Sequence, residues 1–168
     1  NEIRGRVDAW SAAGYPGTTV ISRRLLEHWQ DNTARLHPFY YCQIEAIETL
    51  IWWVEGSAEF RQGVFLPGDG GPWERVCCKM ATGSGKTLVM GMILVWQVAN
   101  ALAYPKRKDF SGAALIVAPG LTVKERLRVL YPGEIQGPLI LEARAATIRE
   151  GIADETARVW DARGHLVV

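Results

Sequence analysis

The alternation of apolar and polar positions along the chain predicts three helices. In TTVISRRLLEHWQD, residues 18–31, apolar side chains recur loosely at helical intervals, and a threonine at the start can serve as the N-cap. In PFYYCQIEAIETLIWWVEG, residues 38–56, apolar side chains fall on one helical face between a proline and a glycine. The third is a mostly apolar stretch from residue 87 to about residue 103, ended by Pro105 and the polar run KRKD.

Two short apolar runs predict buried strands on either side of the third helix. WERVCCKM, residues 73–80, leads directly into a glycine-rich stretch, and GAALIVAPG, residues 112–120, follows the helix. Strand, loop, helix and strand in this order make a βαβ unit, which implies a parallel sheet with crossover helices. PLILEA, residues 138–143, and HLVV, residues 165–168, are further candidate strands around a helix near residues 143–160. The predicted fold class is therefore α/β.

Composition limits the class of protein. The 168 residues are 48% hydrophobic and 22% charged, which suffices for one globular domain. The formal net charge of +1 excludes a bulk polycation, so any nucleic-acid binding needs a local basic patch. Three cysteines without CxxC spacing match no zinc or redox motif and fit a reducing, cytoplasmic compartment. The longest apolar run, residues 88–96, is shorter than a bilayer span, so we expect a buried helix and no membrane partner.

The glycine-rich stretch KMATGSGKTLVM is the main candidate for chemistry. Gly85, Lys86 and Thr87 match the second half of the phosphate-loop pattern GxxxxGK[ST], whereas Met80 stands where the first glycine belongs. Gly83 and Gly85 allow backbone amides to turn toward phosphate oxygens, and the following helix adds the positive end of its dipole. Lys86 supplies a charge for the terminal phosphates, and the Thr87 hydroxyl is a suitable Mg²⁺ ligand.

The alternative for this loop is a plain turn between a strand and a helix. Turns with two glycines are common, but a lysine just inside an apolar helix start is costly unless an anion accompanies it. Phosphate binding is therefore the favoured interpretation.

Three stretches, in order and spacing, resemble motifs of superfamily 2 helicases and translocases. ATGSGKT, residues 81–87, resembles the AxxGxGKT form of motif I, which lacks the first glycine. YCQIEAIETL looks like the glutamine-containing segment upstream of motif I, and LIVAPGLTVKERL resembles motif Ia. The combination is most similar to the Res subunit of type III restriction enzymes and related DEAD/DEAH-box restriction helicases. The resemblance covers about residues 39–130.

This resemblance implies a P-loop NTPase fold with a RecA-like parallel sheet and flanking helices. On this interpretation residues 1–37 are an N-terminal helical extension, and residues 38–168 are a partial RecA-like ATP-binding domain. Because the chain begins without methionine and stops in an apolar run, we expect the domain to be truncated. Residues 1–17 show no pattern that defines an element.

The resemblance also implies ATP and Mg²⁺ as cofactors. Lys86 and Thr87 are then the catalytic residues, and Thr87 holds the Mg²⁺. The residues expected to bind ATP are Gln43, Ala81, Thr82, Gly83, Ser84, Gly85, Lys86 and Thr87.

Gln43 is the residue that the resemblance places on the adenine. A carboxamide presents a donor and an acceptor side by side, which complement N6 and N7 of adenine. Phe39, Tyr40 or Tyr41 can pack on the ring, although tyrosines at a helix start are more often core or rim residues. On the residues alone, a surface glutamine of a helix remains the alternative.

In the segment that resembles motif Ia, Thr122 and Glu125 form a capping box, so a helix is expected to start there. Thr122, Lys124 and Arg126 are the residues that we expect to contact a DNA backbone, together with the helix N-terminus. A solvated helix face is the alternative, and the residues alone leave both open.

The function implied is that of an ATP-dependent helicase or translocase on double-stranded DNA. The resemblance implies the restriction subunit of a type III system, with a modification or specificity subunit as partner and an associated restriction endonuclease in the full-length protein. The Asp-Glu box and the second RecA-like domain are not recognisable, so we expect this chain alone to bind nucleotide without appreciable hydrolysis.

Two other functions stay open at this point. A P-loop kinase or other nucleotide-binding protein acting on a small molecule would need no Gln43 segment and would show an arginine-rich lid, which the sequence lacks. A non-catalytic DNA-binding fragment is disfavoured by the weak net charge.

Overall fold

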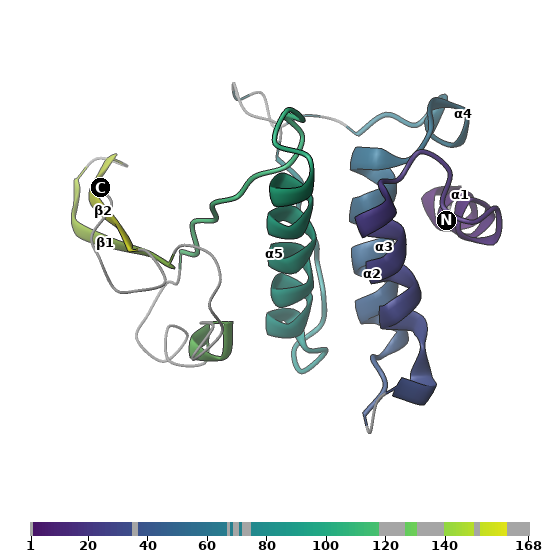
Figure 1. The fold of residues 1–168 in the computed structure, drawn as a ribbon. Coiled ribbons are helices and arrows are strands. Elements are labelled where there is room, and N and C mark those ends of the chain that lie inside the picture. Colours follow the sequence, from purple (N-terminus) through teal and green to yellow (C-terminus); the bar gives the residue numbers. More distant parts are fainter. Residues whose placement is uncertain are drawn as a thin grey trace. The chain divides into compact units, whose positions relative to one another are not determined.

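The computed structural model describes residues 2–34, 37–66, 68, 71, 75–117, 127–130, 140–149 and 152–160. The chain divides into two compact units, residues 1–96 and 97–168. The helices and strands, labelled in Figure 1 where there is room, are α1 (Glu2–Ala12), α2 (Val20–Gln30), the 3₁₀ turn η1 (Asn32–Ala34), α3 (Tyr41–Glu55), α4 (Ala58–Arg61), α5 (Lys86–Ala103), the 3₁₀ turn η2 (Leu127–Leu130), β1 (Ile140–Arg149) and β2 (Ile152–Trp160).

All three predicted helices are confirmed. The side chain of Thr19 accepts a hydrogen bond from the backbone N–H of Ser22 at 3.0 Å and so caps α2. Helix α3 ends at Gly56, whose N–H donates to the carbonyl of Trp52 at 2.9 Å. Local signals were sufficient here, because caps and helical periodicity lie within each segment.

Helix α1 has no counterpart in the sequence prediction. Val7 and Trp10 are its buried residues, and the rest of the helix is mostly polar or small. The Trp10 indole N–H donates to the carbonyl of Pro16 at 2.9 Å. With two buried residues, the sequence of α1 shows only weak helical periodicity of apolar positions. The helix is stabilised by its packing in the folded unit.

The loop between α1 and α2 lies against the C-terminal end of α3. The carbonyl of Pro16 accepts a hydrogen bond from the N–H of Ser57 at 3.1 Å. Gly17 has φ +92°, and a Cβ there would lie 2.6 Å from both the carbonyl oxygen of Glu55 and the N–H nitrogen of Ser57. Only glycine allows this approach, which joins the N-terminal helices to α3.

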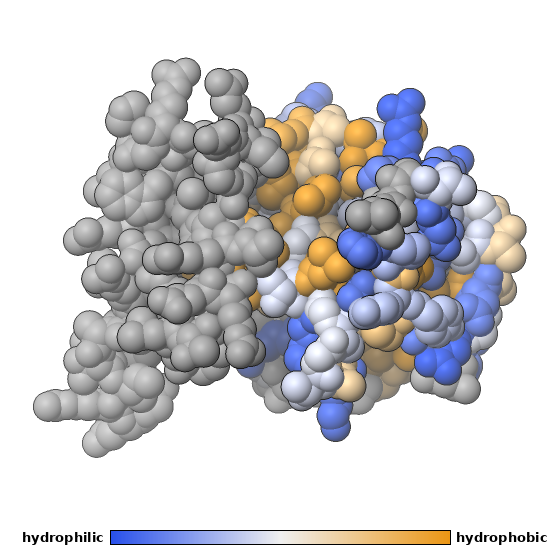
Figure 2. Space-filling view, turned by 90° about the horizontal axis from the view of Figure 1, so that it is seen from below, coloured by the Kyte–Doolittle hydropathy of each residue, from blue (hydrophilic) through white to orange (hydrophobic). Residues whose placement is uncertain are grey.

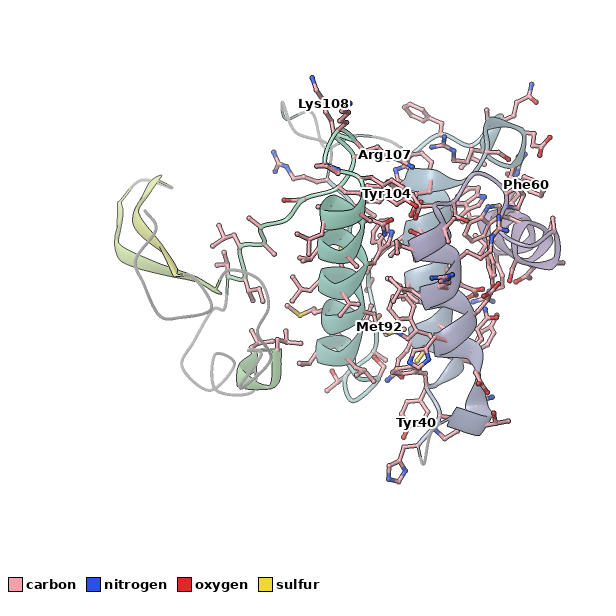
Figure 3. All side chains as sticks on the ribbon, viewed as in Figure 1. Tyr40, Phe60, Met92, Tyr104, Arg107 and Lys108 are labelled. Carbon is pink, nitrogen blue, oxygen red and sulfur yellow. The ribbon has the colours of Figure 1, made fainter. Side chains whose placement is uncertain are left out.

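The core of the first unit combines side chains from α2, α3 and the first part of α5. Figure 1 shows α2 and α3 running alongside each other, and Figure 3 shows Met92 on the side of α5 that faces them. The buried apolar residues of these helices within the unit are Leu26, Trp29, Ile47, Ile51, Trp52, Val89, Met92 and Trp96.

Helix α5 is, among the described residues, the one helix long and apolar enough to cross a membrane. The core helix of a soluble protein meets the same criteria of length and composition. In this structure Trp96 of α5 is buried, and its indole N–H donates to the carboxylate of Glu55 at 2.7 Å. One face of α5 is therefore packed in the first unit, whereas Leu88, Val95 and Leu102 are 46%, 50% and 74% exposed.

The described residues do not form the predicted parallel sheet. Residues 75–80 and 112–117 have no regular secondary structure, and Val76, Leu115 and Val117 are substantially exposed. Figure 2 shows apolar surface on the described part of the molecule. An apolar run indicates burial but does not specify the hydrogen-bonded neighbour that a strand requires. The RecA-like sheet is therefore not seen in the described residues.

The helix predicted near residues 143–160 is wrong. Strands β1 and β2 pair antiparallel, with Ile140 opposite Trp160 and Arg149 opposite Ile152, and the register is irregular between Ala145 and Thr147. Pairing between the two segments overrides the local helix preference of their alanine, glutamate and arginine residues. Of the two further candidate strands, PLILEA lies partly in β1, and HLVV lies outside the described residues.

Candidate nucleotide-binding site

A tight turn immediately precedes α5, as the glycine pattern predicts. Gly83 and Gly85 have φ of +80° and +79°, in the left-handed region that glycine adopts without a steric penalty. The Ser84 hydroxyl donates to the carbonyl of Ala81 at 2.7 Å, and the Ser84 N–H points to the same oxygen at 3.4 Å. The turn is therefore stabilised from within, and Thr82 lies exposed at its tip.

The N-terminus of α5 presents backbone donors beside this turn. The N–H groups of Leu88 and Val89 donate to the carbonyl of Gly85 at 2.9 and 3.3 Å. The N–H groups of Lys86 and Thr87 immediately precede these two, in the first turn, where a helix offers no carbonyl to accept them. Together with the positive end of the helix dipole, they form a site for an anion.

The side chain of Lys86 folds back over the turn. Its Nζ donates to the carbonyl oxygens of Met80 and Ala81 at 2.8 and 2.7 Å, and the side chain remains exposed. These two carbonyls hold the ammonium group close to the anion site. A phosphate bound there gains a charge-assisted hydrogen bond when it replaces one of them.

Thr87 is the second residue of α5 and is partly exposed. Within the described part of the chain, no group of three or more His, Cys, Asp or Glu side chains is arranged to hold a metal ion. Mg²⁺ commonly keeps several waters and binds through phosphate oxygens with few protein ligands. The role of the Thr87 hydroxyl as a Mg²⁺ ligand stays a prediction.

Gln43 connects the first turn of α3 with the phosphate loop. Its side chain is only 3% exposed. The Oε1 atom accepts a hydrogen bond from the N–H of Tyr40 at 3.0 Å, and Nε2 donates to the carbonyl of Ser84 at 2.9 Å. A Cβ on Gly85 would lie 2.2 Å from this Nε2, so the absence of a side chain at Gly85 makes the contact possible.

The adenine contact expected for Gln43 stays a prediction. The amide oxygen and the amide nitrogen of Gln43 each have the capacity for a second hydrogen bond. Tyr40 and Tyr41 are 66% and 67% exposed at the start of α3, and Figure 3 shows Tyr40 at this end of the helix. Exposed aromatic surface therefore lies next to the buried amide.

Cys42 is a neighbour of the loop that the sequence analysis did not identify. Its exposed thiol lies 4.0 Å from the carbonyl of Ser84. The only signal in the sequence is its position next to Gln43. Cys77 and Cys78, which a buried strand would place in the core, are exposed instead.

The residues expected to contact DNA, Thr122, Lys124 and Arg126, lie outside the described residues. The described segment that follows them is η2, in which Leu127 is buried. The nucleic-acid contact therefore stays a prediction.

A glycine turn, a lysine and a helix N-terminus in this arrangement define a class of anion-binding site. A family model described as type III restriction enzyme, res subunit, matches residues 36–138, which is more than half of the chain. The chain belongs to this family of ATP-dependent, helicase-type enzymes. No curated protein and no solved structure matches the chain. The family match does not favour the small-molecule kinase alternative.

Proposed function

We propose that the chain binds ATP with Mg²⁺ within an ATP-dependent DNA helicase or translocase, the restriction subunit of a type III restriction-modification system. The observation that carries the proposal is Lys86, whose Nζ lies over the loop carbonyls beside the N-terminus of α5. Membership of the Res subunit family supports the same interpretation.

Each part of the site has a role in this proposal. Residues 81–87 surround the phosphates with backbone donors, and Lys86 neutralises their charge. Gln43 contacts the adenine. The Thr87 hydroxyl would hold Mg²⁺, which would supply positive charge for phosphoryl transfer in the complete enzyme. Lys86 and Thr87 are therefore the proposed catalytic residues of this chain.

The proposal extends to the partners of the complete enzyme. The complete enzyme acts on double-stranded DNA in the cytoplasm. Its contacts with the DNA backbone come from Thr122, Lys124 and Arg126, and such contacts position the protein without recognising the base sequence. A modification subunit accompanies the enzyme, and a restriction endonuclease is associated with it. This chain by itself is expected to bind nucleotide with negligible hydrolysis.

The test is the affinity of the chain for fluorescently labelled ADP with Mg²⁺, compared with that of Lys86→Ala. Hydrogen bonds to a charged group contribute about 1.5–3 kcal/mol, so we expect roughly 10- to 100-fold weaker binding. Lys106→Ala, which removes an exposed lysine after the end of α5, is the matched control and should bind as the parent chain does. Equal affinity of Lys86→Ala and the parent chain would overturn the phosphate-loop assignment.

A further inference from the structure

Glu55, the last residue of α3, is a buried acid held by donors from three other segments. It is 5% exposed, and Oε2 accepts a hydrogen bond from the N–H of Thr19 at 2.8 Å. The Oε1 atom accepts from the hydroxyl of Ser22 and from the indole N–H of Trp96, the latter at 2.7 Å. The same indole N–H lies 3.1 Å from the Ser22 hydroxyl. This buried cluster joins the loop before α2, α2 itself, α3 and α5.

Hydrogen bonds connect α3 to the loop and α5 near both ends of α3. Glu55 accepts from the indole of Trp96 at the C-terminal end, and Gln43 donates to the carbonyl of Ser84 near the N-terminal end. Glu55 follows Gln43 by twelve positions, and Trp96 follows Ser84 by the same number. Helices α3 and α5 therefore run in the same direction.

The described contacts that hold α5 in the first unit come from its α2–α3 side. Leu88 and Val95, one heptad apart on α5, are 46% and 50% exposed. Rotation or sliding of α5 would separate the Trp96 indole from the Glu55 carboxylate and leave buried polar groups without partners, which is costly. The buried cluster thus fixes the rotation and axial position of the helix that begins with Lys86.

We propose that Glu55 and Trp96 are positioning residues of the nucleotide site. They hold α5 so that Lys86 and Thr87 keep their place relative to Gln43 on α3. Thr19 and Ser22 complete the cluster, and both precede the region matched by the family model, which starts at residue 36. Helix α2 and its N-cap residue therefore help to position this site. The inference rests on the proposed nucleotide binding.

The test compares two tryptophan variants of the full chain. Trp96→Phe removes the indole donor to Glu55. Trp10→Phe is the matched control, because it also removes a buried indole donor, to the carbonyl of Pro16, without touching α5. Both variants should unfold at lower temperature. Only Trp96→Phe should bind labelled ADP more weakly while fully folded, by about fivefold or more, the lower end of usual coupling between sites.

Two further measurements separate positioning from general stability. Glu55→Gln keeps an acceptor oxygen for the Trp96 indole and should retain most of the nucleotide affinity. Coupling between the nucleotide site and the buried cluster predicts that saturation of the unaltered chain with ADP shifts the indole ¹H–¹⁵N resonance of Trp96 and leaves that of Trp10 in place. Loss of one resonance in each variant assigns the two signals.

The outcomes distinguish this inference from the proposed function. If the unaltered chain does not bind nucleotide, the proposed function fails and the inference fails with it. If the chain binds and folded Trp96→Phe binds equally well, only the inference is wrong. If Trp96→Phe does not fold, an unmoved Trp96 resonance in the saturated, unaltered chain overturns the inference.

Discussion

The side-chain amide of Gln43 donates to the backbone carbonyl of Ser84 at 2.9 Å, so the first turn of α3 is bonded to the phosphate loop. The same amide accepts from the N–H of Tyr40, which stabilises the start of α3. A single buried side chain thus connects a helix start, an exposed aromatic surface and the proposed phosphate site. A base that contacts Gln43 would therefore affect the phosphate loop through the hydrogen bond from Gln43 to Ser84.

Replacing Gln43 by alanine should remove any preference for ATP over GTP. A bidentate contact to adenine contributes roughly 1–3 kcal/mol of discrimination by analogy with base readout in DNA. Competition of ATP and GTP against labelled ADP measures the preference, and circular dichroism checks that the variant is folded. Gln62→Ala, a change of an exposed glutamine in the same unit, is the control. If the parent chain shows no preference between ATP and GTP, the phosphate-loop assignment stands and the proposed contact of Gln43 with adenine is wrong.

Gly85→Ala should disturb base selection as well as phosphate binding. A Cβ at this position meets Gln43 Nε2 at 2.2 Å, and φ is +79°. Gly83→Ala shares the strained φ of +80° but has nothing within 4 Å of its Cβ. Both variants carry the backbone strain of about 1–2 kcal/mol that a positive φ imposes on alanine. A difference in nucleotide binding between them therefore reports the contact with Gln43.

The measurement for this glycine pair is again competition of ATP and GTP. We expect Gly83→Ala to bind both nucleotides more weakly with the preference retained, and Gly85→Ala to lose the preference. Equal loss of preference in the two variants would show that loop strain, and not the contact with Gln43, is responsible.

Glu48 should make the stability of the first unit dependent on pH. Burial is the largest cause that raises the pKa of its carboxyl above the ordinary value of 4.5, and hydrogen bonds from Ser11, Tyr15 and Gln30 act in the opposite direction. Because the folded state binds the proton more tightly, the contribution of Glu48 to the free energy of unfolding falls as pH rises from 4.5 through the raised pKa.

Glu48→Gln removes this titration and keeps an acceptor oxygen for the three donors. Urea unfolding between about pH 4 and 7 should show that the variant loses less stability than the parent chain as pH rises above the ordinary carboxyl value. The same decline in both proteins would mean that burial of Glu48 does not contribute to the pH dependence.

The sequence by itself determined the parts of this protein whose signals are local. A threonine cap for α2, most of the apolar face of α3 and the length of α5 each follow from residues within one segment, and so do the glycine positions of the loop. A local signal suffices because a helix satisfies its backbone hydrogen bonds within itself. The same motifs pointed to the Res subunit family, which the family model confirmed.

Tertiary structure decided the features that need a distant partner. Helix α1 depends on a narrow buried contact, and the stretch expected to be helical near residues 143–160 forms the β1–β2 hairpin. The bonds from Gln43 to Ser84 and from Trp96 to Glu55 join residues 41 positions apart in each case. Apolar periodicity indicates which side chains are buried, but it does not specify which group each buried side chain contacts. That choice depends on the packing of the whole unit.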